Sequence, residues 1–393
     1  MYDKASIALI PSGYKSGGVD NLYSVLPANG NGDFNATRAS TATRVNKDGL
    51  IETVATNVPR LDYPLTNGVV GDCPHLLLEP SRTNLLTQSV NLTSIFTFNT
   101  GGGSLNANYG VSPDGSKTST RVTTNDTNNS HCFATISGGS GSLTYSLYYK
   151  GIIGETTTIR AIAVGSGGVS AEKSITFTGK WQREQITFQR GASVNYVYIV
   201  DYRSINGTAT DFQVFGGQVE EGSYPTSYIP TSGSTETRSA DICNDSGTSA
   251  EFNDSEGVLF AEVEFLDNAN TGYISVSDGT ADNRCIIYSA ANQIVVATKS
   301  GGSGISKSAT GTPTNLNKIA VAYSSSGSKF FLNGSNETGT GSFSTTPRVF
   351  AANTLDQINL DISDGSNDLY ARVKQVIYFN EALSDSELQT LTS

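Results

Sequence analysis

Short runs of alternating apolar and polar residues recur through most of this 393-residue sequence, and Gly-, Ser- and Asn-rich turns separate them. Alternation with a period of two places every second side chain on the same face, which is typical of half-buried β-strands. Charged residues make up only 16% of the chain and glycine accounts for 41 positions, a composition that favours turn-rich β-structure over long helices. The sequence therefore predicts an all-β protein.

The spacing of these runs predicts tandem antiparallel β-sandwiches (jelly rolls) over residues 95–230 and 251–393, because short strands with regular turn punctuation are typical of that architecture. Asn333-Gly334 predicts a hairpin turn, and Ser384 with Glu387 predicts a capped short helix over residues 382–388. The strands expected in the two sandwiches cover residues 143–149, 157–164, 173–177, 182–188, 192–200, 212–220, 257–265, 273–276, 285–288, 293–297, 318–323, 329–332 and 373–379.

Residues 1–94 predict an irregular, hairpin-rich N-terminal block. Runs over residues 41–46 and 50–54 flank Lys47-Asp48-Gly49, a strong hairpin signal. Four prolines between residues 59 and 80 leave room only for brief strands. The block has so little apolar content that we expect it to bury its faces against a partner.

A linker over residues 231–250 carries Thr237-Arg238, which repeats Thr37-Arg38, and we interpret this repeat as part of a joint between modules.

The charge of the chain argues against two classes of partner. A net charge of -11 and a sequence pI of about 4.7 predict no binding to nucleic acid. We also expect no membrane insertion, because no apolar run is long enough, and we find no secretion signal at the start. The four cysteines have no close spacing and are expected to be reduced and buried: Cys73, Cys132, Cys243 and Cys285.

The N-terminal block resembles a known family in three runs, residues 37–54, 57–63 and 76–86, which include Thr37-Arg38-Ala39 and Glu79-Pro80-Ser81-Arg82. These runs resemble the amino-terminal block of a large family of bacteriophage virion proteins, described as tail-fibre or other structural proteins. The resemblance implies localisation in the virion after assembly in the host cytoplasm, and other virion proteins as partners. It also implies a homo-oligomer, with a trimer as the first candidate.

Two further resemblances concern the sandwiches. Gly179-Lys-Trp-Gln-Arg183, followed later by the strand over residues 212–220, resembles the jelly-roll carbohydrate-binding modules of phage fibres and glycan hydrolases. The strand ending in Val376-Ile-Tyr-Phe379, the helix over residues 382–388 and the Phe331-Leu-Asn-Gly334 hairpin resemble a concanavalin A-like lectin/glucanase (LamG-like) domain. Both resemblances imply lectin-like modules, and host surface glycans are the ligands to consider.

These observations predict a non-enzymatic virion structural protein, as a tail fibre, head fibre, spike or decoration. The alternatives are a secreted carbohydrate-binding adhesin and a glycoside hydrolase of the glucanase type. A hydrolase needs two opposed carboxylates, for which Glu262 and Glu264 are the closest candidates, but the compact Glu-x-Asp-x-x-Glu arrangement of the family is absent. His75 and His131 lie in no catalytic motif, so we predict that the protein is not an enzyme.

Four arginines are dense for so acidic a chain and are candidates for attachment to a neighbouring subunit or virion protein, with salt bridges inside the chain as the alternative. They are Arg38, Arg44, Arg60 and Arg82. No cofactor is predicted, except that residues 278–283 and 361–368 are candidate calcium segments, with tight Asp-Gly turns as the alternative. Trp181 is expected to be a packing residue.

Overall fold

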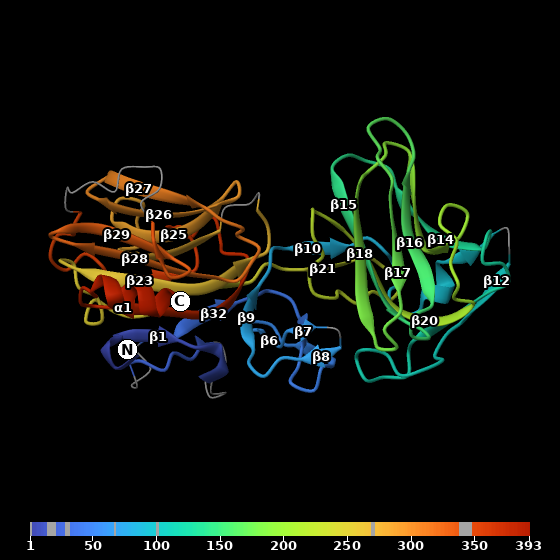
Figure 1. Ribbon diagram of the computed structural model, residues 1–393, viewed down its shortest axis with the longest axis horizontal. Helices are drawn as coiled ribbons and strands as arrows, with labels where there is room; N and C mark the ends of the chain where they lie inside the picture. The colour runs from blue at the N-terminus through green and yellow to red at the C-terminus, as the bar shows by residue number, and fades with distance from the viewer. Residues whose placement is uncertain are drawn as a thin grey trace.

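The computed structural model describes residues 2–13, 21–27, 32–66, 68–99, 102–268, 272–337 and 348–393. It confirms the all-β class and the tandem antiparallel sandwiches. Figure 1 shows two lobes side by side, the middle sandwich in green and the C-terminal sandwich in yellow to red, with the blue N-terminal block beneath and between them.

The middle sandwich consists of two five-stranded antiparallel sheets. Its core holds aromatic and aliphatic side chains such as Tyr145, Tyr149, Phe212 and Val197, which come from the inner faces of both sheets. One sheet has the order β11 (Thr97–Phe98), β14 (His131–Ser137), β19 (Val194–Asp201), β16 (Thr156–Ala163), β17 (Ala171–Thr176). The other has the order β12 (Gly103–Asn106), β13 (Thr120–Thr124), β20 (Asp211–Glu221), β15 (Ser142–Lys150), β18 (Gln182–Gln189).

The C-terminal sandwich packs an eight-stranded sheet against a five-stranded one. The larger sheet has the order β30 (Ser335–Asn336), β29 (Gly327–Leu332), β28 (Asn317–Ser324), β23 (Gly257–Phe265), β32 (Ala371–Phe379), β9 (His75–Leu78), β6 (Leu61–Asp62), and β1 (Ile7–Leu9) also pairs with β32. The smaller has the order β27 (Ser303–Thr310), β26 (Gln293–Ser300), β25 (Arg284–Ala290), β24 (Tyr273–Ser277), β31 (Gln357–Asn359).

Three strands from the N-terminal block therefore complete the sheet of the C-terminal sandwich. β1 pairs with β32 at residues 376–378, and β9 pairs with the same strand at residues 371–373. Ile7, Leu9, Leu76 and Leu78 are buried in the same core as the C-terminal strands. The partner that the sparse N-terminal block needs is thus the far end of its own chain.

The outer face of the eight-stranded sheet is covered by helix α1 (Asp385–Thr392) and by the N-terminal segment. Leu388 packs in this layer with Phe260 and its neighbours. The capping box is present, because Ser384 accepts a hydrogen bond from the backbone N–H of Glu387 and the Glu387 side chain accepts one from the backbone N–H of Ser384. No helix in the described parts of the chain is long and apolar enough to cross a membrane.

Smaller sheets and short turns make up the rest of the described secondary structure. The predicted hairpin is formed by β4 (Ala42–Val45) and β5 (Ile51–Val54), with Gly49 at φ 77°, a left-handed conformation that glycine adopts without strain. The other elements are β2 (Asn21–Leu22), β3 (Phe34–Thr37) and β22 (Ile242–Asn244) in one sheet; the pairs β7 (Leu65–Thr66) with β8 (Val69–Val70) and β10 (Arg82–Asn84) with β21 (Glu236–Arg238); and the 3-10 turns η1 (Tyr2–Lys4), η2 (Pro11–Gly13) and η3 (Leu92–Ser94).

Candidate functional site

A groove of about 690 Å³ lies where the N-terminal block and both sandwiches meet. The N-terminal block contributes Asp62 and Tyr63 to its lining, the middle sandwich contributes Trp181, and the C-terminal sheet contributes Glu264 and Arg372. A concave surface that combines aromatic rings with convergent polar groups at a junction between domains is the usual form of a small-ligand site in proteins. The groove is therefore the main candidate site.

Trp181 forms an aromatic wall of this groove directly before strand β18. Its half-buried ring packs beside a cluster of Ile51, Tyr148, Phe215 and Tyr228, and its indole N–H donates to the carbonyl of Val111 at 3.1 Å. Both contacts hold the ring in a fixed orientation, while the residue still lines the groove. Trp181 thus packs as predicted and also contributes to the candidate site.

The carboxylates that line the groove are engaged by groups of the chain. Glu184 accepts from Lys173 at 2.7 Å and from Gln182 at 2.9 Å. Asp62 accepts from the backbone N–H of Val45 at 2.7 Å, and its other oxygen lies 3.2 Å from Nε2 of the buried His75. These bonds fix the side chains and leave acceptor lone pairs available to a ligand.

The two glutamates that were candidates for a hydrolase both lie on β23, but only Glu264 lines the groove. Glu264 accepts from Arg372 at 2.6 Å on the neighbouring strand β32. Glu262 accepts from Gln375 at 2.7 Å and lies 3.9 Å from Lys374. The cross-strand register Glu264↔Arg372 and Glu262↔Gln375 explains both contacts, since directly opposed side chains interact.

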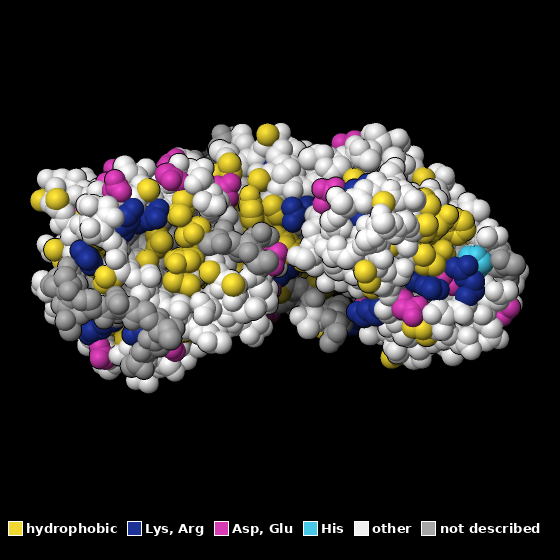
Figure 2. Space-filling view, turned by 90° about the horizontal axis from the view of Figure 1, so that it is seen from above, with side chains coloured by type: hydrophobic (Ala, Val, Ile, Leu, Met, Phe, Trp, Pro, Cys, Tyr) yellow, Lys and Arg dark blue, Asp and Glu magenta, His cyan; other side chains and the backbone are white. Residues whose placement is uncertain are grey.

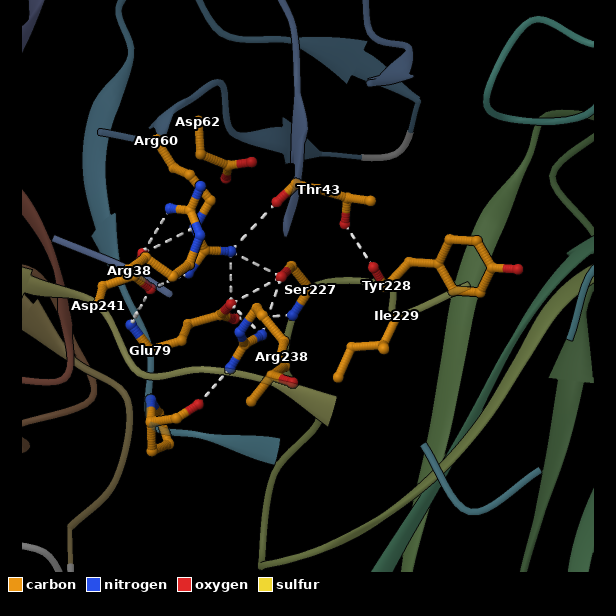
Figure 3. Close-up of polar contacts among 12 residues, drawn as sticks. Arg38, Thr43, Arg60, Asp62, Glu79, Ser227, Tyr228, Ile229, Arg238 and Asp241 are labelled. Carbon is orange, nitrogen blue, oxygen red and sulfur yellow. Dashed lines mark hydrogen bonds and ion pairs between the residues drawn. The ribbon is translucent and has the colours of Figure 1, made fainter. Parts of the chain in front are cut away.

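Beside the groove, three arginines and two carboxylates from distant segments form a buried ion cluster (Figure 3). Its members are Arg38, Arg60, Glu79, Arg238 and Asp241, which are between 0 and 4% exposed. Arg60 and Arg238 each bind Oε2 of Glu79 at 2.7 Å. Arg38 binds Asp241 at 2.9 Å, and Arg60 also pairs with Asp241.

The two copies of the Thr-Arg repeat meet at this cluster. Arg38 follows β3 and Arg238 ends β21, and both donate into the same group of carboxylates. The backbone N–H of Ser239 also donates to Oγ of Ser40 at 2.9 Å, so the segments that follow the two arginines touch. The cluster joins the N-terminal block to residues 222–235, the connector that leads from β20 to β21, through Ser227, whose hydroxyl donates to Glu79 at 2.7 Å.

Electrostatics explain why these charges stay ionised inside the protein. Burial alone would raise the pKa of Glu79, but the guanidinium groups of Arg238 and Arg60 outweigh burial and hold that pKa well below its usual range. Burial lowers the pKa of Arg38 and of Arg238, and the carboxylates of Asp241 and Glu79 oppose that shift. The carboxylates thus offset part of the cost of burying Arg38 and Arg238, while the arginines more than offset the cost of burying Glu79.

The four predicted attachment arginines separate into two pairs. Arg38 and Arg60 are buried and pair within the chain, which is the alternative that the sequence left open. Arg44 binds Glu52 at 2.7 Å and remains partly exposed. Arg82 donates to the carbonyl of Ser81 at 3.2 Å, and its guanidinium lies 5.6 Å from the centre of the Tyr224 ring.

A second group of aromatic side chains lies on the outer face of the middle sandwich. His131 and Phe133 on β14 and Tyr196 and Tyr198 on β19 have ring centres 5.4 to 6.5 Å apart. Arg203 lies 5.3 Å above the Tyr198 ring. Figure 2 shows hydrophobic side chains gathered on one face of this right-hand lobe, with basic and histidine side chains beside them. His131 takes part as a packed ring whose Nδ1 lies 3.1 Å from the carbonyl of Asn129.

The candidate calcium segments form hydrogen-bonded turns. Asp278 accepts from Thr280 and from Asn283, and Asp361 accepts from Ser363 and from Asn244. Within the described ranges, no three His, Cys, Asp or Glu side chains are arranged to hold a metal ion. Calcium binding at these turns stays a prediction.

The cysteines differ from their expected uniform burial. Cys132, Cys243 and Cys285 are buried free thiols, and burial raises the pKa of each. Cys73 is exposed, because it lies in the connector between β8 and β9 rather than within a sheet.

No family model matches the chain. No curated protein matches it either. Among solved structures, the chain is similar to the CBM40 of an IT-sialidase from Ruminococcus gnavus, with 14% identity and a TM-score of 0.31 over 38% of this chain and 94% of that one. It is also similar to the CBM22 tandem domain of Xyn10C from Paenibacillus barcinonensis, with 12% identity and a TM-score of 0.27 over 75% and 97% of the two chains. Mouse laminin α1 domains LG4-5 give 12% identity and a TM-score of 0.24 over 66% and 88%. Likenesses with TM-scores this low do not identify a function.

Sequence reasoning did not find the groove. Its lining is shared among the N-terminal block, the middle sandwich and the C-terminal sandwich, and no local pattern indicates that these parts of the chain meet at one surface. The one local signal was Trp181, the single tryptophan of the sequence, which stands two positions before Arg183 on the groove wall.

Proposed function

We propose that this protein is a non-enzymatic structural protein of a bacteriophage particle that binds a host surface glycan in the groove. The resemblance of residues 37–86 to virion proteins supports the assignment to a phage particle. The observation that supports glycan binding is the lining of the groove, in which Trp181 and Tyr63 stand beside charged side chains held by the chain.

The chemistry of the groove suits a sugar. The apolar face of a pyranose ring stacks on a flat aromatic side chain, while its hydroxyls need several donors and acceptors at fixed positions. Trp181 is fixed by its packing cluster and by its bond to Val111. Asp62 and Arg372 on other walls are fixed by Val45 and Glu264. Such preorganisation reduces the entropy lost on binding.

Binding in the groove is tested by isothermal titration with oligosaccharides selected on a glycan array. We expect Trp181→Ala to weaken binding by about 2 kcal/mol, roughly 30-fold, because it removes the stacking surface. Tyr2→Ala is the matched control, since Tyr2 is exposed on the C-terminal sandwich and does not line the groove. Unfolding curves of each variant establish that it is folded.

The same titration tests the rival location on the outer face of the middle sandwich. Tyr196→Ala removes a ring from the aromatic group on β14 and β19. If that variant loses binding while Trp181→Ala keeps it, the groove is the wrong site.

The proposed absence of catalysis has its own test. In the hydrolase alternative, Glu264 in the groove is one of the two catalytic carboxylates. We expect no release of reducing sugar from any bound glycan, by the wild type or by Glu264→Gln. Hydrolysis that Glu264→Gln abolishes would establish the alternative.

The particle assignment is tested on the phage itself. Mass spectrometry of gradient-purified particles should detect the chain in constant ratio to the major capsid protein. A chain that stays in the soluble fraction would contradict the assignment and favour a free adhesin. Light scattering of the purified protein tests the expected homo-oligomer, with a trimer as the first candidate.

A further inference from the structure

We infer that the groove selects an acidic saccharide, whose carboxylate or sulfate ester is held by Arg183. This inference deepens the proposed function and rests on it.

Three other cations of the groove each have a carboxylate partner. Arg44 binds Glu52 at 2.7 Å, and Arg372 binds Glu264 at 2.6 Å. Lys374 lies 3.9 Å from Glu262. The charges of these pairs largely cancel, so they contribute little net attraction for an ion.

Arg183 differs, because no carboxylate of the described chain lies within ion-pair distance of its guanidinium. Nη1 donates to the carbonyl of Thr226 at 2.7 Å, and Nη2 donates to Oγ of Ser146 at 2.9 Å. Nε is buried and has no hydrogen-bond partner among the described residues. Two neutral acceptors therefore serve a full positive charge that has five N–H donors.

The surroundings hold this guanidinium still. It lies 5.3 Å from the centre of the Tyr148 ring, which is the cross-strand partner of Arg183 on β15. Stacking on an aromatic face and two fixed hydrogen bonds restrict its rotation. A planar fork that is already oriented loses little entropy when it binds a carboxylate or a sulfate.

The position of the charge fits a sugar that stacks on Trp181. Arg183 lies on β18, Trp181 precedes it by two positions directly before that strand, and both line the groove. A pyranose on the indole ring then places its acidic substituent within reach of the guanidinium. A neutral sugar has no group that could compensate this charge.

The experiment uses the full chain and an immobilised panel of oligosaccharides arranged in matched sets. Each set shares one neutral core and contains a member without charge, a member with one carboxylate and a member with one sulfate ester. We expect the wild type to bind an acidic member about 10- to 100-fold more tightly than its neutral core, as a charge-assisted hydrogen-bond pair provides.

Two variants test whether Arg183 causes the preference for the acidic saccharide. Arg183→Gln should reduce binding of the acidic member to the level at which the same variant binds the neutral core. An unfolding curve establishes that the variant is folded. Arg183→Lys should keep part of the preference, because it retains the charge without the planar fork. Arg121→Gln is the control, since Arg121 is held by Asp211 through two bonds of 2.8 and 2.6 Å outside the groove.

The outcomes separate this inference from the proposed function. A wild type that binds neutral and acidic members equally, or an Arg183→Gln variant that keeps the preference, would overturn the inference and leave glycan binding in place. Binding of inorganic sulfate as tight as that of the sulfated saccharide would also overturn it, since the site would then be a simple anion site. A panel without any ligand would remove both proposals.

Discussion

The buried ion cluster makes a quantitative prediction for Glu79→Gln, a substitution that keeps the size of the side chain and removes its charge. Glu79 accepts four bonds of 2.7 Å, from Arg60, from Arg238 and from the backbone N–H and hydroxyl of Ser227. The amide would leave three buried guanidinium groups with Asp241 as their one remaining carboxylate in the cluster.

Removing one partner from a buried ion pair costs about 3 to 5 kcal/mol, because the remaining charge stays desolvated without compensation. We expect the free energy of unfolding to fall by about that amount. Urea unfolding followed by the fluorescence of Trp181 is the assay, since this single tryptophan packs beside Tyr228. Tyr228 directly follows Ser227, the connector residue that donates to Glu79, so the reporter lies close to the perturbed contact.

Glu221→Gln is the control for this experiment. Its side chain is 71% exposed and makes an ion pair with Arg190 at 3.2 Å. The substitution should therefore lower the free energy of unfolding by less than about 1 kcal/mol. A Glu79→Gln variant whose free energy of unfolding lies within about 1 kcal/mol of the wild-type value would refute the idea that the cluster holds the N-terminal block to the connector.

The pH dependence gives the same experiment a second readout. The pKa of Glu79 is depressed in the folded protein, so its stabilisation is fully present above the unfolded value of about 4.3 and is lost as the pH falls below it. The difference in the free energy of unfolding between wild type and Glu79→Gln should therefore be equal at pH 7 and at about pH 5.5, and should decrease toward about pH 3. A difference that widens on acidification would contradict this sign.

Three further predictions concern other parts of the chain. Burial, and then the charge of Asp361, raise the pKa of Asp368 to about 6, so ionisation of this carboxyl destabilises the fold as the pH rises toward that value. Asp368→Asn should therefore increase the free energy of unfolding at about pH 8 by up to about 1 kcal/mol and leave it unchanged at about pH 3, as thermal unfolding will measure. Cys73 should react with a maleimide in the native protein while the three buried cysteines react only after denaturation, as mass spectrometry of the labelled peptides will show. Ser384→Ala removes the N-cap of α1 and should destabilise that helix by about 1 kcal/mol, which would appear as faster hydrogen exchange confined to residues 385–392.

Local patterns predicted the strands well where apolar residues alternate. The expected strand over residues 257–265 has the same bounds as β23, and the capping box at Ser384 is present. β27 and β14 were not predicted. β27 is the sequence Ser-Gly-Ile-Ser-Lys-Ser-Ala-Thr, which has too few large apolar side chains to show a period, and its place in the sheet comes from pairing with β26.

Long-range organisation was harder to predict for a physical reason. The repeat of Thr37-Arg38 at Thr237-Arg238 indicated a joint, and both arginines do enter one cluster. Their partners could not be predicted, because Glu79 has no local feature that distinguishes it from an exposed acid. The groove was hidden for the same reason, since only the folded chain brings Asp62, Trp181 and Glu264 to one surface.

The pairing of β1 and β9 with β32 has a consequence for the order of events during synthesis. Leu78 leaves the ribosome long before its partner Ala371, and the interval is roughly 15 to 60 s at elongation rates of about 5 to 20 residues per second. Until then the apolar strands Ile7–Leu9 and His75–Leu78 have no edge of β32 to join. A chain that terminates early therefore leaves these two apolar segments without their partner strand, and protein quality control can remove such a chain.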